Sequence, residues 1–176
     1  TYYKTYFDLE YQTSIATVEK VQKELLTSEQ AFVQFMKTDS AFYVFVIEDD
    51  KKQFLKLSKS NADIANLQQF QIILQSSKGI QNDGLNTFET FTTLAYQNYQ
   101  QFFEPIKKYL SPTTTALIIV PDGALNYLPF ESLLGKPVVS KSVDFLRLPY
   151  LIRDYQFHYG YSGTLLLENK AKNNDL

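Results

Sequence analysis

The sequence contains no cysteine, no tryptophan and a single histidine among its 176 residues. The lack of thiols excludes disulfides, thiolate metal sites and a cysteine nucleophile within this chain. Because His158 is the only imidazole, most histidine-based metal sites are excluded as well. A histidine base also needs a nucleophile within hydrogen-bond reach, and no motif supplies one. We therefore expect no catalytic residue, no metal ion and no cofactor, and a surface or structural role for His158.

An excess of basic residues and a long apolar run are also missing. The chain has 17 Lys and Arg against 19 Asp and Glu, which leaves a net charge of −2. Since nucleic-acid binding depends on a basic surface, we expect no nucleic-acid partner. No apolar run approaches the roughly 20 residues of a bilayer span, so we expect no membrane partner. The chain starts at Thr1 without an apolar signal region; we expect a cytoplasmic piece of a longer protein, with upstream signals left open.

Two helices are predicted near the amino terminus. Residues 15–25 carry apolar side chains at helical spacing. Thr27 and Gln30 have the spacing of a capping box, in which each side chain binds the N–H of the other residue. Residues 31–35 would supply the buried face behind this motif. The pattern thus predicts a second helix that begins at Thr27.

A hairpin and two further helices are predicted next. Residues 41–47 are aromatic and β-branched on both alternating faces, which is typical of a strand covered on both sides. A polar turn over 48–52 leads to a second strand over 53–57. Ser60 is placed to cap a helix, and residues 86–102 repeat aromatic side chains at helical spacing.

Pro105 must kink or restart the preceding helix, and the sequence pattern changes after Leu110. Residues 116–120 form a continuous apolar run, typical of a central strand in a parallel or mixed sheet. Pro121-Asp122-Gly123 predicts an abrupt turn, residues 155–159 alternate like a strand, and Ser162 can cap a last helix. Strands that alternate with helices predict an α/β fold, in which helices flank a layered mixed sheet.

The stretch 116–134 resembles the CHAT domain, a caspase-like module that is commonly fused to tetratricopeptide repeats. In that family a buried strand ends in Pro-Asp-Gly, and Tyr-Leu-Pro-Phe-Glu follows. The resemblance extends, mainly as a pattern, over residues 25–168. It implies a structural motif formed by Pro121, Asp122, Gly123, Tyr127, Pro129, Phe130 and Glu131.

The resemblance also implies a domain organisation and a class of parent protein. Residues 1–24 would form a helical connector or last repeat helix, 25–168 the N-terminal, pseudo-caspase part, and 169–176 a polar tail. Family members resemble caspases and use a histidine and a cysteine at strand ends. Those residues lie beyond the Ser162 helix, and His158 is not at the family's histidine position. The implied parent is a bacterial, cysteine-peptidase-type protein, whose activity this chain leaves open.

Two functions follow from this reading. In the first, we expect the chain to be a non-catalytic N-terminal half that acts as a scaffold and binds tetratricopeptide repeats or the catalytic half of the same protein. Alternatively, it is a self-contained interaction module that binds peptides by strand addition. A sheet with an unpaired edge also predicts a homodimer through that edge.

Two carboxylates of the motif allow further roles. Asp122 follows a buried strand, where α/β proteins bind ligands, and would be a metal or phosphate ligand in a third hypothesis. Asp and Gly also suit a tight turn, which is the role that we favour. For Glu131 we expect an anchoring role toward backbone N–H groups or toward an arginine such as Arg147 or Arg153.

Overall fold

A five-stranded mixed sheet forms the centre of the protein in a computed structural model that describes residues 15–75, 84–139 and 142–174. The strand order is β3-β2-β1-β4-β5. β2 pairs antiparallel with β1 and β3, whereas β4 pairs parallel with β1 and β5. The predicted α/β class with a layered mixed sheet is thus confirmed. The strands are β1 Gln30–Lys37, β2 Ala41–Ile47, β3 Lys52–Ser58, β4 Ala116–Val120 and β5 Gln156–Tyr159.

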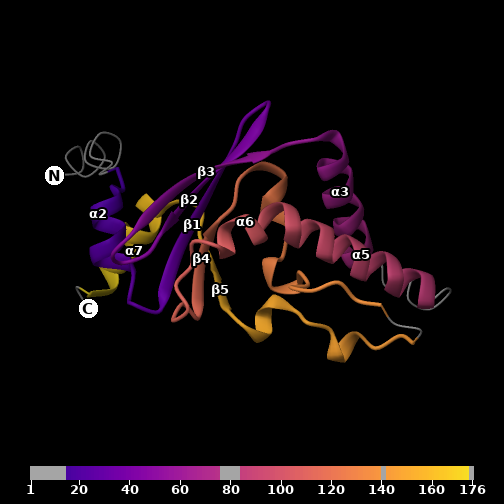
Figure 1. Ribbon diagram of the computed structural model, residues 1–176. Coiled ribbons are helices and arrows are strands. Elements are labelled where there is room, and N and C mark those ends of the chain that lie inside the picture. Colours follow the sequence, from indigo (N-terminus) through magenta and orange to yellow (C-terminus); the bar gives the residue numbers. More distant parts are fainter. Residues whose placement is uncertain (1–14, 76–83, 140–141, 175–176) are drawn as a thin grey trace.

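Helices cover the two faces of the sheet unequally (Figure 1). The first face packs against α3 (Asn61–Gln75), α5 (Gly84–Phe102) and α6 (Glu104–Lys107). The second face carries α2 (Val18–Lys20), the π-helical turn η1 (Val21–Leu25) and α7 (Gly163–Asn174). Within the described ranges, no helix is both long and apolar enough to span a membrane. Short 3-10 helices occupy the connections: η2 Gly123–Tyr127, η3 Phe130–Ser132, η4 Phe145–Arg147 and η5 Leu151–Arg153.

The main hydrophobic core lies between the first face and the long helices. Alternate residues of the central strands, such as Phe35 of β1 and Leu117 of β4, are buried in it. The predicted aromatic stripe of α5 is buried, and Pro105 stands in the first turn of α6, where a missing N–H costs nothing. Ser60 and Asp63 bind each other's N–H groups at 2.9 and 3.1 Å, as the predicted cap of α3 requires.

The described residues cover the second face only in part. A small cluster around Val21, Phe32 and Leu167 joins η1 and α7 to the sheet. Beyond it, Phe45 of β2 and Phe54 of β3 stay 38% and 49% exposed. In the part of the chain that the structure describes, the strand over 41–47 is therefore covered along its whole length on one side only, and the prediction of cover on both sides is wrong.

The helix predicted to begin at Thr27 is wrong, because these residues form β1. The Gln30 side chain does accept the Thr27 N–H at 3.1 Å, but the Gln30 N–H also donates to the Thr27 carbonyl at 3.0 Å. These bonds close a turn before the strand. Pairing with β2 and β4 on either side overrides the local helix signal. The first helix also begins late, at Val18, and leaves Ile15 exposed.

Candidate functional site

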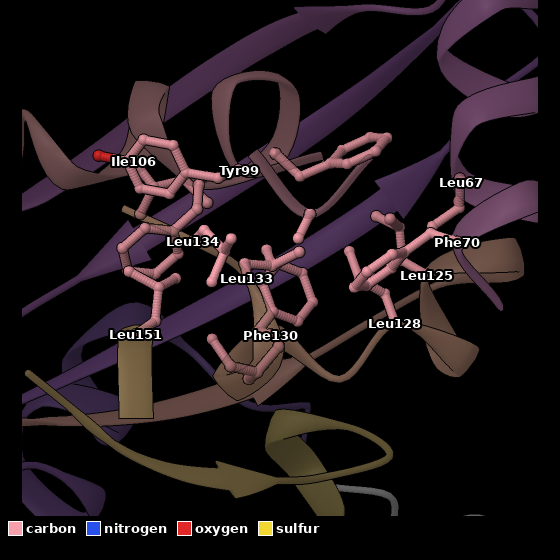
Figure 2. Packing of buried hydrophobic residues seen from close by; sticks show 14 of the residues in the cluster. Leu67, Phe70, Tyr99, Ile106, Leu125, Leu128, Phe130, Leu133, Leu134 and Leu151 are labelled. Carbon is pink, nitrogen blue, oxygen red and sulfur yellow. The ribbon is translucent and has the colours of Figure 1, made fainter. Parts of the chain in front are cut away.

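The carboxyl ends of the parallel strands β1, β4 and β5 meet at one edge of the sheet, where α/β proteins bind ligands. The motif over 121–131 leaves β4 at this edge. Its apolar side chains point into the main core, where Figure 2 shows Leu125, Leu128 and Phe130 clustered with Leu67 and Phe70 of α3. The Phe130 ring lies 5.4 Å from that of Phe35 in β1. These contacts fix the polar residues of the motif above the strand ends.

Asp122 and Gly123 form the turn that follows β4. Asp122 Oδ2 accepts the backbone N–H of Lys37 at 2.7 Å, which connects the ends of β4 and β1. Gly123 has φ of +60°, a conformation that residues with a Cβ rarely adopt. In the described part of the chain, no three His, Cys, Asp or Glu residues gather as a metal ion requires. The bond from the Lys37 N–H thus ties this turn to the end of β1.

Glu131 is held by the last residue of β5. The Tyr159 hydroxyl donates to Glu131 Oε2 and accepts the backbone N–H of Phe130 at 2.9 Å. Burial and the neighbouring carboxylate raise the pKa of Tyr159 far above its ordinary value of 10.0, so the hydroxyl remains a donor. This pair joins η3 to the end of β5. The sequence gives no sign of it, because the two residues lie 28 positions apart.

The expectation that Arg147 or Arg153 anchors Glu131 is wrong. Arg147 pairs with Asp144, with 3.5 Å between Nε and Oδ2. Arg153 donates to the carbonyl oxygens of Leu148 and Leu146 at 3.0 and 2.5 Å. Both arginines therefore bind partners within the 144–153 segment, and the Tyr159 hydroxyl binds Glu131 instead.

Two adjoining cavities open beside Glu131, and we call them together the cleft. The larger, about 500 Å³, is lined mainly by apolar residues from α3, α5 and the 145–152 segment. The smaller, about 370 Å³, lies against Tyr127, Pro129 and Tyr159. Leu74, Gln75 and Glu131 line both cavities. The cleft is thus an apolar depression with a carboxylate in its shared wall.

His158 lies outside the cleft. It is exposed and pairs in register with Ile118 of β4. Because side chains alternate along a strand, His158 and the neighbouring Tyr159 point to opposite faces of the sheet. Its imidazole is on the second face, away from Glu131.

Glu48 is a buried polar residue that sequence reasoning missed, since residues 48–52 were predicted as a polar turn. Its side chain is 3% exposed and accepts bonds from the Ser111 N–H and from the hydroxyls of Ser111 and Thr114. Lys51 Nζ adds an ion pair at 2.9 Å. The partners in the loop before β4 lie more than 60 positions away. No local pattern marks such a contact.

Comparison with known families matches residues 92–175 to the CHAT domain. This part of the chain is similar to the CHAT domain. The matched CHAT segment holds most of α5 and everything from α6 to α7, including the motif over 121–131 and its partner Tyr159. It confirms the resemblance found in the sequence, and the flanked mixed sheet agrees with a caspase-like CHAT fold. No curated protein matches the chain.

Proposed function

We propose that this chain is the non-catalytic N-terminal half of a CHAT-type, caspase-related protein and acts as its scaffold and partner-binding surface. The family match supports the caspase-like relationship. The chain has no cysteine for thiolate attack, and its only imidazole is exposed on the face opposite the cleft. The observation that carries the proposal is the open edge of β5.

The open edge is defined by the direction of the backbone N–H groups of β5. The N–H of Gln156 donates to the Thr115 carbonyl at 2.8 Å, and that of Gly160 donates to Ile119 at 2.9 Å. Because successive N–H groups alternate in direction, those of Phe157 and Tyr159 point away from β4. Among the described residues, β4 is the only strand that pairs with β5.

Such an edge is normally covered or extended by another strand. In the proposed scaffold role, the catalytic half of the same protein adds its first strand to β5, and preceding tetratricopeptide repeats bind elsewhere. The same edge also supports the alternative, a self-contained module to which a peptide adds as a strand. The two differ in one property: a half-domain should self-associate, whereas a complete module should be a monomer.

Light scattering over a range of concentrations tests the scaffold role. We expect the purified chain to form dimers or larger species through β5. A Phe157→Pro variant removes an outward N–H without touching the bonds to β4, and should reduce association; Phe157→Leu is the matched control. A monomer at high concentration would contradict the scaffold proposal and favour the self-contained module.

A peptidase assay tests the non-catalytic part of the proposal. The purified chain should cleave no member of a broad peptide library. Cleavage that disappears in a His158→Ala variant would overturn it, because the activity would then depend on this chain's own imidazole.

A further inference from the structure

Glu131 is a carboxylate that lines both cavities of the cleft and forms no ion pair among the described residues. The three ion pairs within the described residues use Glu48, Glu19 and Asp144 as their acids. Glu131 instead has one hydroxyl donor on Oε2 and lines both cavities of the cleft. A carboxylate accepts several hydrogen bonds, so the group retains capacity for a further donor.

The position of this carboxylate is fixed by its neighbours. The Tyr159 hydroxyl binds it and is itself bound by the Phe130 N–H at 2.9 Å. Phe130 is fully buried, so the short helix η3 that carries Glu131 is anchored to the main core. The carboxylate is therefore oriented before any ligand arrives, which lowers the entropic cost of binding.

The surroundings of Glu131 are apolar and accessible. Leu74 and Ile152 are 40% and 61% exposed at the larger cavity, and Tyr127 is 72% exposed at the smaller one. Binding sites in proteins commonly combine such an apolar lining with a few placed polar groups. A ligand that matches this cleft therefore combines a positively charged group with apolar groups.

We propose that the cleft binds an extended polypeptide segment of a partner protein, with an apolar side chain in the larger cavity and an arginine or lysine against Glu131. Basic side chains suit this arrangement because their long stems pack along apolar surface while the charged head reaches a polar group. Apolar residues on both sides of Glu131 allow neighbouring side chains of one segment to bind together. Tyr159 lines the smaller cavity, but Phe157, on which the scaffold test depends, lines neither cavity. This proposal can therefore fail while the scaffold role holds.

The charge requirement is tested with fluorescein-labelled, capped hexapeptides of sequence Leu-Ala-Leu-X-Ala-Ser. X is arginine in one peptide and citrulline, its neutral isostere, in the other. Fluorescence anisotropy should give at least about tenfold tighter binding of the arginine peptide, because hydrogen bonds between charged groups are the strong ones. Glu131→Gln should bring the ratio close to one, whereas Glu24→Gln, an exposed glutamate of η1, should keep it.

The apolar requirement is tested on α3. Leu74→Ser should weaken both peptides several-fold and leave their ratio unchanged, because buried apolar area is lost but not the charge. Ile72→Ser is the matched control, since Ile72 is 65% exposed on the same helix and lines neither cavity. Circular dichroism of each variant confirms that it is folded.

Three results would overturn the proposal. They are equal affinity of the two peptides, a ratio that Glu131→Gln leaves unchanged, and no saturable binding of the arginine peptide at millimolar concentration. Dimers that dissociate in Glu131→Gln, without peptide competition, would instead identify a second copy of the chain as the occupant. The scaffold role has its own readout, self-association that depends on Phe157.

Discussion

The two ends of the sheet each hold a glutamate, and the structure uses them differently. Glu48 follows the end of β2, beside the start of β4, and is buried. Its carboxylate accepts hydrogen bonds from Ser111 and Thr114 and forms an ion pair with Lys51. Glu131 lies at the carboxyl edge and has Tyr159 as its partner beside an open cleft. One carboxylate is used to tie a turn to a distant loop, whereas the other remains accessible. The buried and the accessible carboxylate thus lie at opposite ends of the sheet.

The largest expected effect separates the two glutamates by their contribution to folding. Glu48→Gln should lower the free energy of unfolding by about 2–4 kcal/mol, because the negative charge is lost and one of the two acceptor oxygens is replaced by an NH2 group that faces buried donors. Glu131→Gln should cost less than about 1 kcal/mol, since its site is partly exposed. Urea unfolding followed by circular dichroism measures both. Equal losses in the two variants would remove the distinction between the ends.

The response to acid sharpens the same comparison. Burial pushes the pKa of Glu48 upward, but hydrogen bonds from Ser111 and Thr114 and the Lys51 ammonium outweigh it and place the pKa below the ordinary 4.5. At acidic pH the unfolded chain then binds more protons than the folded one. The stabilisation by the ionised Glu48 carboxylate is therefore complete when the pH is above the pKa of Glu48 in the unfolded chain. It is lost as the pH falls through the lower folded value.

We therefore expect the free energy of unfolding of the parent chain to fall as the pH is lowered below about 4.5. In Glu48→Gln it should fall less steeply. Urea unfolding at a series of pH values gives the two slopes. A parental slope in Glu48→Gln would mean that other carboxylates set the acid response.

The sequence correctly predicts the strands, helices and turns whose structure depends on residues close together in the chain. The apolar run of β4, the hairpin of β2 and β3, and the aromatic stripe of α5 are each marked by a local sequence pattern, and each is found where predicted. The motif over 121–131 was also located correctly as a turn after a buried strand. Patterns within about ten residues carried these predictions.

The predictions are wrong where residues far apart in the sequence determine the secondary structure or the contact. Residues 30–37 form a strand because β2 and β4 lie on either side, although Thr27 and Gln30 form a local capping pattern. Likewise, Glu131 binds Tyr159 rather than an arginine, and Glu48 binds Ser111 across 63 positions. Such contacts depend on the register of the sheet, which composition and spacing do not contain.

A smaller effect is expected at the link between η3 and β5. Tyr159→Phe removes the hydroxyl that accepts the Phe130 N–H and donates to Glu131, and should cost about 1.5 kcal/mol of unfolding free energy. Tyr127→Phe is the matched control, because Tyr127 is 72% exposed and its change should cost little. Thermal and urea unfolding measure both. Equal costs would mean that the hydroxyl pair does not hold the carboxyl edge together.

The smallest expected effect concerns the turn that starts the carboxyl edge. Gly123→Ala places a Cβ on a residue with φ of +60°, where it also meets the flexible Lys37 side chain at 2.6 Å. The left-handed conformation should cost about 1 kcal/mol of unfolding free energy. Gly135→Ala is the matched control, since φ there is not positive and the nearest side-chain atom would lie at 3.6 Å. A cost in Gly123→Ala but not in Gly135→Ala, measured by urea unfolding, would show that the turn after β4 requires the left-handed conformation. Equal costs would contradict that requirement.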